Sequence, residues 1–249
     1  YLQANGAVFP PYYQYPPCDV YDLKFQMPVE ECGNMLIMTA ACCEIDKNAE
    51  FAKPYQGLLK TWTEYLLTYG ADPGEQLCTD DFAGHLAHNT NLAVKAIMGI
   101  KAFARILELL GDDSESMRYR SQAAAMAAVW ETTARGKGHT ALTFGDTDSW
   151  SLKYNLVWDR FFGNPLFSGD IISGDLAWYV EKCGEYGTPL DSRSSYTKSD
   201  WILWCASMAG DKEMFQALTA PVEDEEQHER FDYKETASVT TGLGDLLKG

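Results

Sequence analysis

The stretch NTNLAVKAIMGIKAFARILELL, residues 89–110, decides the fold class of this chain. Its apolar residues Leu92, Ala96, Ile100 and Phe103 recur every three or four positions. That spacing places side chains along one face of an α-helix, whereas a half-buried strand would alternate apolar and polar residues. The stretch therefore predicts a long helix with one apolar face.

The rest of the chain repeats this helical pattern and offers few strand signals. Apolar residues follow helical spacing in four further segments, at 51–69, 119–130, 172–183 and 201–208. The segment 35–43 is almost entirely apolar, which predicts a fully buried helix. Alternation typical of a strand is confined to residues 139–144. We therefore predict an all-α fold.

Short and long connections alternate between the predicted helices. The short ones lie at 46–48, 111–114 and 210–211, and the long ones at 70–88, 136–151 and 187–199. In a stack of antiparallel helix hairpins, this alternation places the short turns at one end and the long loops at the other. Loops of that length are uncommon unless they are functional or disordered. We predict an αα-hairpin array that forms an α/α toroid, left incomplete because six hairpins need more chain.

Composition excludes several classes of partner. The chain has 249 residues and a net charge of −16, which argues against nucleic acid and anionic membrane surfaces. It contains no apolar run near the roughly 20 residues of a membrane span, and no signal-peptide pattern. Because residue 1 is Tyr, we expect that a leader or another domain precedes it. We divide the chain into an entry segment (1–30), a catalytic toroid domain (31–221) and an acidic C-terminal segment (222–249).

The seven cysteines give no metal or disulfide framework. They form no CxxC pair and no zinc-ribbon spacing, and an odd number cannot pair completely within one chain. Most sit in apolar surroundings, where free cysteine behaves as a small hydrophobe. We predict no metal and no cofactor, and the cysteines do not fix the compartment.

Four polar clusters lie on the predicted long loops and mark a candidate site. The first, within 27–34, holds Glu30, Glu31 and Asn34, and the second, within 79–91, holds Asp80, Asp81, His85, His88, Asn89 and Asn91. Neighbouring carboxylates can titrate apart and give one acid and one base, although acidic residues also favour helix starts. If a helix begins near residue 84, the histidines share a face, and we prefer metal-free chemistry there because HExxH spacing is lacking.

The other two clusters are aromatic and basic. Residues 150–160 include Asn155, Trp158 and Asp159, and residues 190–201 include Asp191, Arg193, Lys198, Asp200 and Trp201. Tryptophan on a helix more often belongs to the core than to a substrate platform. Arg193 and Lys198 beside carboxylates suit the binding of an anionic group such as an α-carboxylate. Four clusters at one end of the array favour an active site.

Four strings resemble the helical domain of the glutaminase A family: MPVEECGNMLIM (27–38), LCTDDFAGHLAHNTNLAVKAI (77–97), WSLKYNLVWDRFFG (150–163) and PLDSRSSYTKSDWILW (189–204). The resemblance runs from about residue 26 to residue 221. It implies an α/α-toroid domain preceded by β-rich domains, hydrolysis of L-glutamine to glutamate and ammonia, and secretion. The segment after residue 221 departs from the family's usual ending, which puts closure of the toroid and any ligand from that segment in doubt.

For this chemistry we assign roles to the clusters. The catalytic set is Glu31, Asp80, Asp81 and His85, which would assist the attack of water on the amide. The remaining residues would bind a small-molecule substrate: Glu30, Asn34, His88, Asn89, Asn91, Asn155, Trp158, Asp159, Asp191, Arg193, Lys198, Asp200 and Trp201. Two alternatives stay open. One is a glycoside hydrolase that uses Glu31 and Asp81 as its carboxylate pair. The other is an inactive binding paralogue.

Overall fold

The computed structural model describes the backbone of residues 27–78 and 85–228, with side chains up to Val222. Over these residues the chain forms eight α-helices and two short 3-10 helices, with β-type pairing limited to isolated bridges, which confirms the all-α prediction. The elements are α1 (Pro28–Asp46), η3 (Lys53–Tyr55), α2 (Gln56–Tyr69), α3 (Thr90–Leu109), α4 (Asp113–Thr133), η5 (Tyr154–Leu156), α5 (Val157–Phe161), α6 (Gly169–Glu181), α7 (Ser199–Ala206) and α8 (Lys212–His228).

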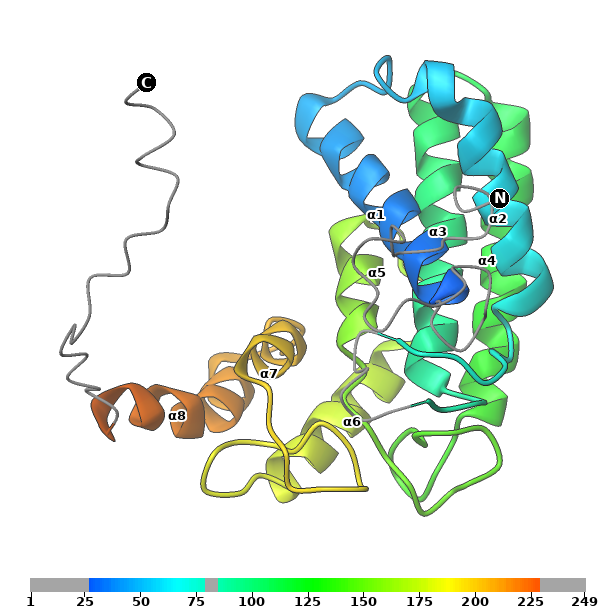
Figure 1. Cartoon of the computed structure of the whole chain (residues 1–249). Coiled ribbons are helices and arrows are strands. Elements are labelled where there is room, and N and C mark those ends of the chain that lie inside the picture. The colour runs from blue at the N-terminus through cyan, green and yellow to red at the C-terminus, as the bar shows by residue number, and fades with distance from the viewer. Residues whose placement is uncertain (1–26, 79–84, 229–249) are drawn as a thin grey trace, which may run out of the picture.

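Helices α1 to α4 form a bundle of two antiparallel hairpins, and α6, α7 and α8 extend to one side of it (Figure 1). The links 47–55 and 110–112 join the helices of each hairpin at one end of the bundle. The longer links 70–89 and 134–153 leave from the other end, where α1 and α3 begin. This arrangement confirms the predicted hairpin array. We call the end with the long links the loop face.

Helix α3 is the centre of the bundle and is buried along most of its length, against α1 and α4. Two glycines let α1 and α3 approach closely. A Cβ on Gly33 would lie 2.6 Å from Lys95 Cγ, and a Cβ on Gly99 would lie 3.1 Å from Gly33 Cα. Because both distances are shorter than normal carbon contacts, larger residues at these positions would push the helices apart.

Helix α1 corrects one prediction. The segment 35–43 lies within it but is not buried on all sides, since Met38 is 60% exposed while Leu36, Ile37 and Ala40 are buried. The described residues cover only the face of α1 that meets α2 and α3. A run of apolar residues therefore does not mean that every side of the helix is covered. None of the described helices is both long and apolar enough to cross a membrane.

The start of α3 corrects another prediction. Residues 85–89 are not helical, because α3 begins at Thr90 with Asn89 as its N-cap. The Asn89 side chain accepts hydrogen bonds from the backbone N–H groups of Asn91 and Leu92, which satisfies two donors that a helix start leaves without partners. His88 has a φ of 62°, a left-handed conformation that cannot continue a right-handed helix.

Candidate active site

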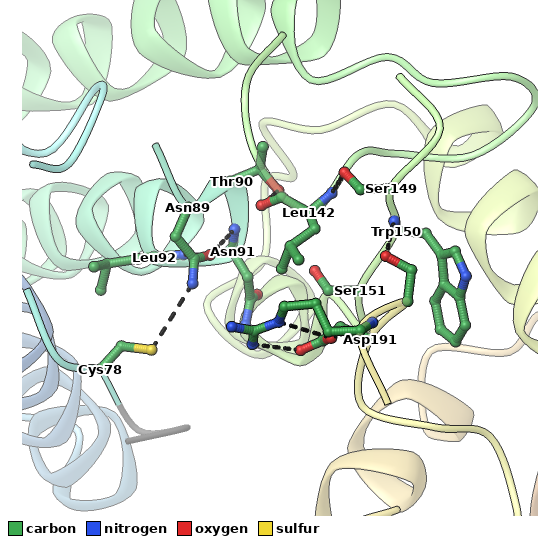
Figure 2. Close-up of polar contacts among 12 residues, drawn as sticks. Cys78, Asn89, Thr90, Asn91, Leu92, Leu142, Ser149, Trp150, Ser151 and Asp191 are labelled. Atoms are coloured by element: carbon green, nitrogen blue, oxygen red, sulfur yellow. Dashed lines mark hydrogen bonds and ion pairs between the residues drawn. The ribbon is translucent and has the colours of Figure 1, made fainter. Parts of the chain in front are cut away.

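Two long links meet at the first turn of α3 on the loop face (Figure 2). Thr90 donates from its backbone N–H to Leu142 O at 3.0 Å and from Oγ1 to Ala141 O at 2.5 Å. The link 134–153 is itself tied to the link 182–198, since Trp150 N–H donates to Ser192 Oγ at 3.2 Å. Segments that are far apart in sequence are thereby fixed around one helix terminus.

Two asparagines in this region carry amide oxygens without partners. Asn155 Nδ2 donates to Asn91 O at 3.1 Å, which joins η5 to the first turn of α3. The Oδ1 atoms of both residues are buried and accept no hydrogen bond within the described part of the chain. Because buried polar atoms are nearly always hydrogen-bonded, each of these two acceptors is open to a donor from a ligand.

A buried ion pair joins the start of α1 to α3. Glu30 is 2% exposed, and its Oε1 lies 3.1 Å from Lys95 Nζ. Lys95 also donates to Asn34 Oδ1 at 2.5 Å, and Asn34 Nδ2 donates to Glu30 Oε1 at 3.3 Å. The structure thus brings together the predicted residues Glu30 and Asn34, and it adds Lys95, a cation within the otherwise apolar stretch LAVKAI (92–97).

Glu31 lies next to this pair and has a perturbed carboxyl group. Partial burial raises the pKa of Glu31, and the neighbouring Glu30 carboxylate raises it further, while Lys95 and Asn34 act in the opposite direction. A carboxyl group with a raised pKa can hold a proton closer to neutral pH and pass it to a reacting atom. Glu31 is the one predicted catalytic carboxylate within the described residues, and its raised pKa suits it to proton transfer.

The basic cluster of the link 182–198 is held by its own carboxylates. Arg193 forms a two-pronged pair with Asp191, with Nε to Oδ1 at 2.9 Å and Nη2 to Oδ2 at 2.6 Å. Asp191 also pairs with Ser151 in an isolated bridge, which places it beside the start of α3 (Figure 2). Lys198 Nζ lies 3.8 Å from the exposed Asp200.

The predicted tryptophans have packing roles. Trp201 stacks on Tyr154 at a ring-centroid distance of 4.1 Å. Trp158 packs edge-to-face against Trp204, at 5.3 Å. Both rings therefore belong to an aromatic cluster between η5, α5 and α7, as tryptophan on helices commonly does.

The histidine segment is only partly described. Asp80 and Asp81 lie outside the described residues. His85 is half-buried, and His88 is exposed, with Nδ1 at 2.8 Å from Asp72 Oδ1. Since the segment is not helical, these two histidines do not share a helix face with Asn89, which instead caps α3.

Asp159 lies away from the residues gathered on the loop face. It is fully buried, accepts from Lys101 Nζ at 2.6 Å, and also accepts from the backbone N–H groups of Leu166 and Phe167. Lys101 lines a pocket of about 290 Å³ together with Glu44, Arg105 and Glu108, which lie in the C-terminal halves of α1 and α3. Asp159 and Lys101 thus form a buried structural ion pair.

The sequence reasoning missed a buried lysine. Lys153 is 0% exposed and donates to Ser151 Oγ at 2.7 Å and to Ser151 O at 3.0 Å. Burial lowers the pKa of Lys153 to about 8. Its position between apolar residues in WSLKYNL (150–156) was the available signal, since a lysine rarely sits among apolar neighbours without a role.

Within residues 27–78 and 85–222, no three His, Cys, Asp or Glu side chains come together as metal ligands would. The six cysteines of this part are all free thiols. The described polar side chains of the loop face include carboxylates, amides, hydroxyls and cations.

Comparisons with known proteins identify the same family that the sequence strings resemble. A family model described as the glutaminase A six helical-hairpin domain matches residues 13–239. Glutaminase A of Aspergillus oryzae is 38% identical over 200 residues, which cover 78% of this chain and 29% of that protein. A probable glutaminase of Arthroderma benhamiae is 31% identical over 173 residues, 58% of this chain and 20% of that protein. The chain thus spans less than a third of the length of either relative.

Proposed function

This chain belongs to the glutaminase A six helical-hairpin family, and from that premise we propose that it hydrolyses L-glutamine to L-glutamate and ammonia. The observation that carries the proposal is the pair of buried amide oxygens of Asn91 and Asn155, which lack a hydrogen-bond donor among the described residues. Glutamine has donors of the required kind in its carboxamide and ammonium groups. The Arg193 guanidinium on the same face suits its α-carboxylate.

We assign the proton transfers of this reaction to Glu31. Amide hydrolysis needs a proton for the departing ammonia and a base for the attacking water. The raised pKa of Glu31 keeps its carboxyl group protonated to a higher pH than usual, so it can supply the first proton. Once ionised, the same carboxylate can accept a proton from water. Asp80 and Asp81 remain candidates for the same task.

A direct assay tests the activity. The full chain is incubated with L-glutamine, and the glutamate formed is measured with a coupled dehydrogenase. L-Asparagine and an oligosaccharide serve as competing substrates, the second with a reducing-sugar readout. Release of glutamate from glutamine, with no product from L-asparagine or the oligosaccharide, supports the proposal. Release of reducing sugar without glutamate would replace it with glycoside hydrolysis, and no turnover of any substrate would favour a binding function.

A pair of variants tests the role of Glu31. Glu31→Gln removes the titrating group at the loop face, and we expect kcat to fall by about 10²-fold or more. Glu50→Gln is the matched control, since Glu50 is exposed in the short link between α1 and α2. Full turnover by Glu31→Gln would remove this residue from the mechanism while leaving the proposed activity intact.

A further inference from the structure

We propose that Ser151 is the nucleophile of this site and that the Lys153 amine activates it, so that hydrolysis passes through an acyl-serine ester. This inference rests on the proposed amide hydrolysis and adds to it the atom that attacks the amide carbon. It also assigns the attack of water to a second step.

The geometry of the pair is that of a hydroxyl beside its base. Lys153 Nζ lies 2.7 Å from Ser151 Oγ, within hydrogen-bond distance. Lys153 is fully buried, and its side-chain hydrogen bonds go only to Ser151 among the described residues. No carboxylate of those residues lies within ion-pair distance of Nζ. Since burial of an ammonium without an ion-pair partner is costly, the equilibrium shifts toward the neutral amine, which can accept the hydroxyl proton.

The surrounding charges keep this amine within reach of neutral pH. Burial is the main cause of the lowered pKa of Lys153, about 8. Asp175, Cys205 and Asp191 act in the opposite direction, from α6, α7 and the link 182–198 respectively. Burial also raises the pKa of Asp175, which accepts from Thr140 N and Oγ1, each at 2.7 Å. About half of the Lys153 amine is therefore unprotonated at pH 8, and about a tenth at pH 7.

The backbone around the pair is fixed by one tyrosine of α6. Tyr179 Oη donates to Ser151 O at 2.9 Å and accepts from Lys153 N–H at 2.9 Å. Ser151 is 5% exposed and lies in the same region as Asn91 and Asp191 (Figure 2). The hydroxyl is therefore both held in place and close to the residues proposed to bind the substrate.

The reaction then balances in two steps. In the first step, Ser151 Oγ bonds to the carboxamide carbon and its proton moves to Lys153 Nζ. The C–N bond breaks, and the nitrogen takes a proton from the Glu31 carboxyl and leaves as ammonia. In the second step, water attacks the ester carbon and gives a proton to the Glu31 carboxylate. The C–Oγ bond breaks, and the Lys153 ammonium returns its proton to Ser151.

Turnover of glutamine gives the first test. Ser151→Ala should lower kcat by about 10³-fold or more, because no hydroxyl remains to attack. Lys153→Arg keeps the positive charge but cannot lose it, so it should abolish turnover as well. Ser121→Ala on the exposed face of α4 is the control and should match the unaltered chain. Far-UV circular dichroism confirms that each variant is folded.

Reaction with a fluorophosphonate gives a second test that does not depend on glutamine. Mass spectrometry should find the label on Ser151, at a rate that rises with pH around a midpoint near 8. The label should be lost in Lys153→Arg. Labelling of Ser151 in a chain that does not hydrolyse glutamine would support the pair and overturn the proposed function. Turnover by Ser151→Ala above a tenth of the normal rate would overturn the inference. So would absence of the label in a chain that does not hydrolyse glutamine.

Discussion

Removal of the Asp159 charge should destabilise the fold through the buried cation that it neutralises. Asp159 is fully buried and accepts from Lys101 Nζ at 2.6 Å and from the N–H groups of Leu166 and Phe167. Asp159→Asn keeps the shape but turns one acceptor into a donor and leaves the ammonium without a counter-charge. Breaking one side of such a pair costs about 3–5 kcal/mol of unfolding free energy.

Urea unfolding followed by far-UV circular dichroism measures this cost. A loss of that size corresponds to a fall in the melting temperature on the order of 10 °C for a domain of this length. Lys101→Met in the Asp159→Asn background should restore most of the loss, because the unpaired charge is then gone. Asp148→Asn is the control, since the Asp148–Lys137 pair is exposed and should contribute little. A loss below about 1 kcal/mol for Asp159→Asn would refute this account of the pair.

Three further predictions follow from other parts of the bundle. The pKa of Glu31 is raised above 4.5 in the folded chain, so the folded state binds the proton more tightly than the unfolded state, and stability falls as pH rises above 4.5. Glu31→Gln should therefore raise the melting temperature at pH 7 but not at pH 4. A lower melting temperature at pH 7 would contradict this. Gly33→Ala should cost about 1–3 kcal/mol in urea unfolding, whereas Gly57→Ala, with open space around its Cβ, should stabilise by about 0.5–1 kcal/mol. Iodoacetamide at pH 8 should modify the exposed Cys42 in the folded chain but not Cys32, whose pKa burial raises to about 12, and equal modification on peptide mapping would count against the packing of α1.

The loop face shows how far sequence spacing can locate a site. Alternation of short and long links was enough to predict which loops lie at one end of the bundle. The structure joins the side chains of Glu30 and Asn34, which lie four positions apart, to Lys95 of α3. The alternation could not separate Asp159 from this group, because the contacts of that residue come from segments well beyond its own cluster.

The sequence could not predict which individual side chains are buried. Met38 and Ala40 stand in the same apolar run, yet one is largely exposed and the other is fully covered, because only one side of α1 meets its neighbours. Lys153 was passed over for the related reason that its burial depends on distant segments, such as α6, whose Tyr179 Oη accepts from the Lys153 backbone N–H.

The sequence by itself determined the all-α class, the hairpin order and the family, because helix formation depends on residues three and four positions apart. Only the tertiary structure decided which polar groups lose their water. Desolvation and ion pairing depend on atoms brought together from distant segments, and they set the raised pKa of Glu31 and the lowered pKa of Lys153. Spacing therefore predicts where the candidate site lies, and packing sets the pKa values of the residues there.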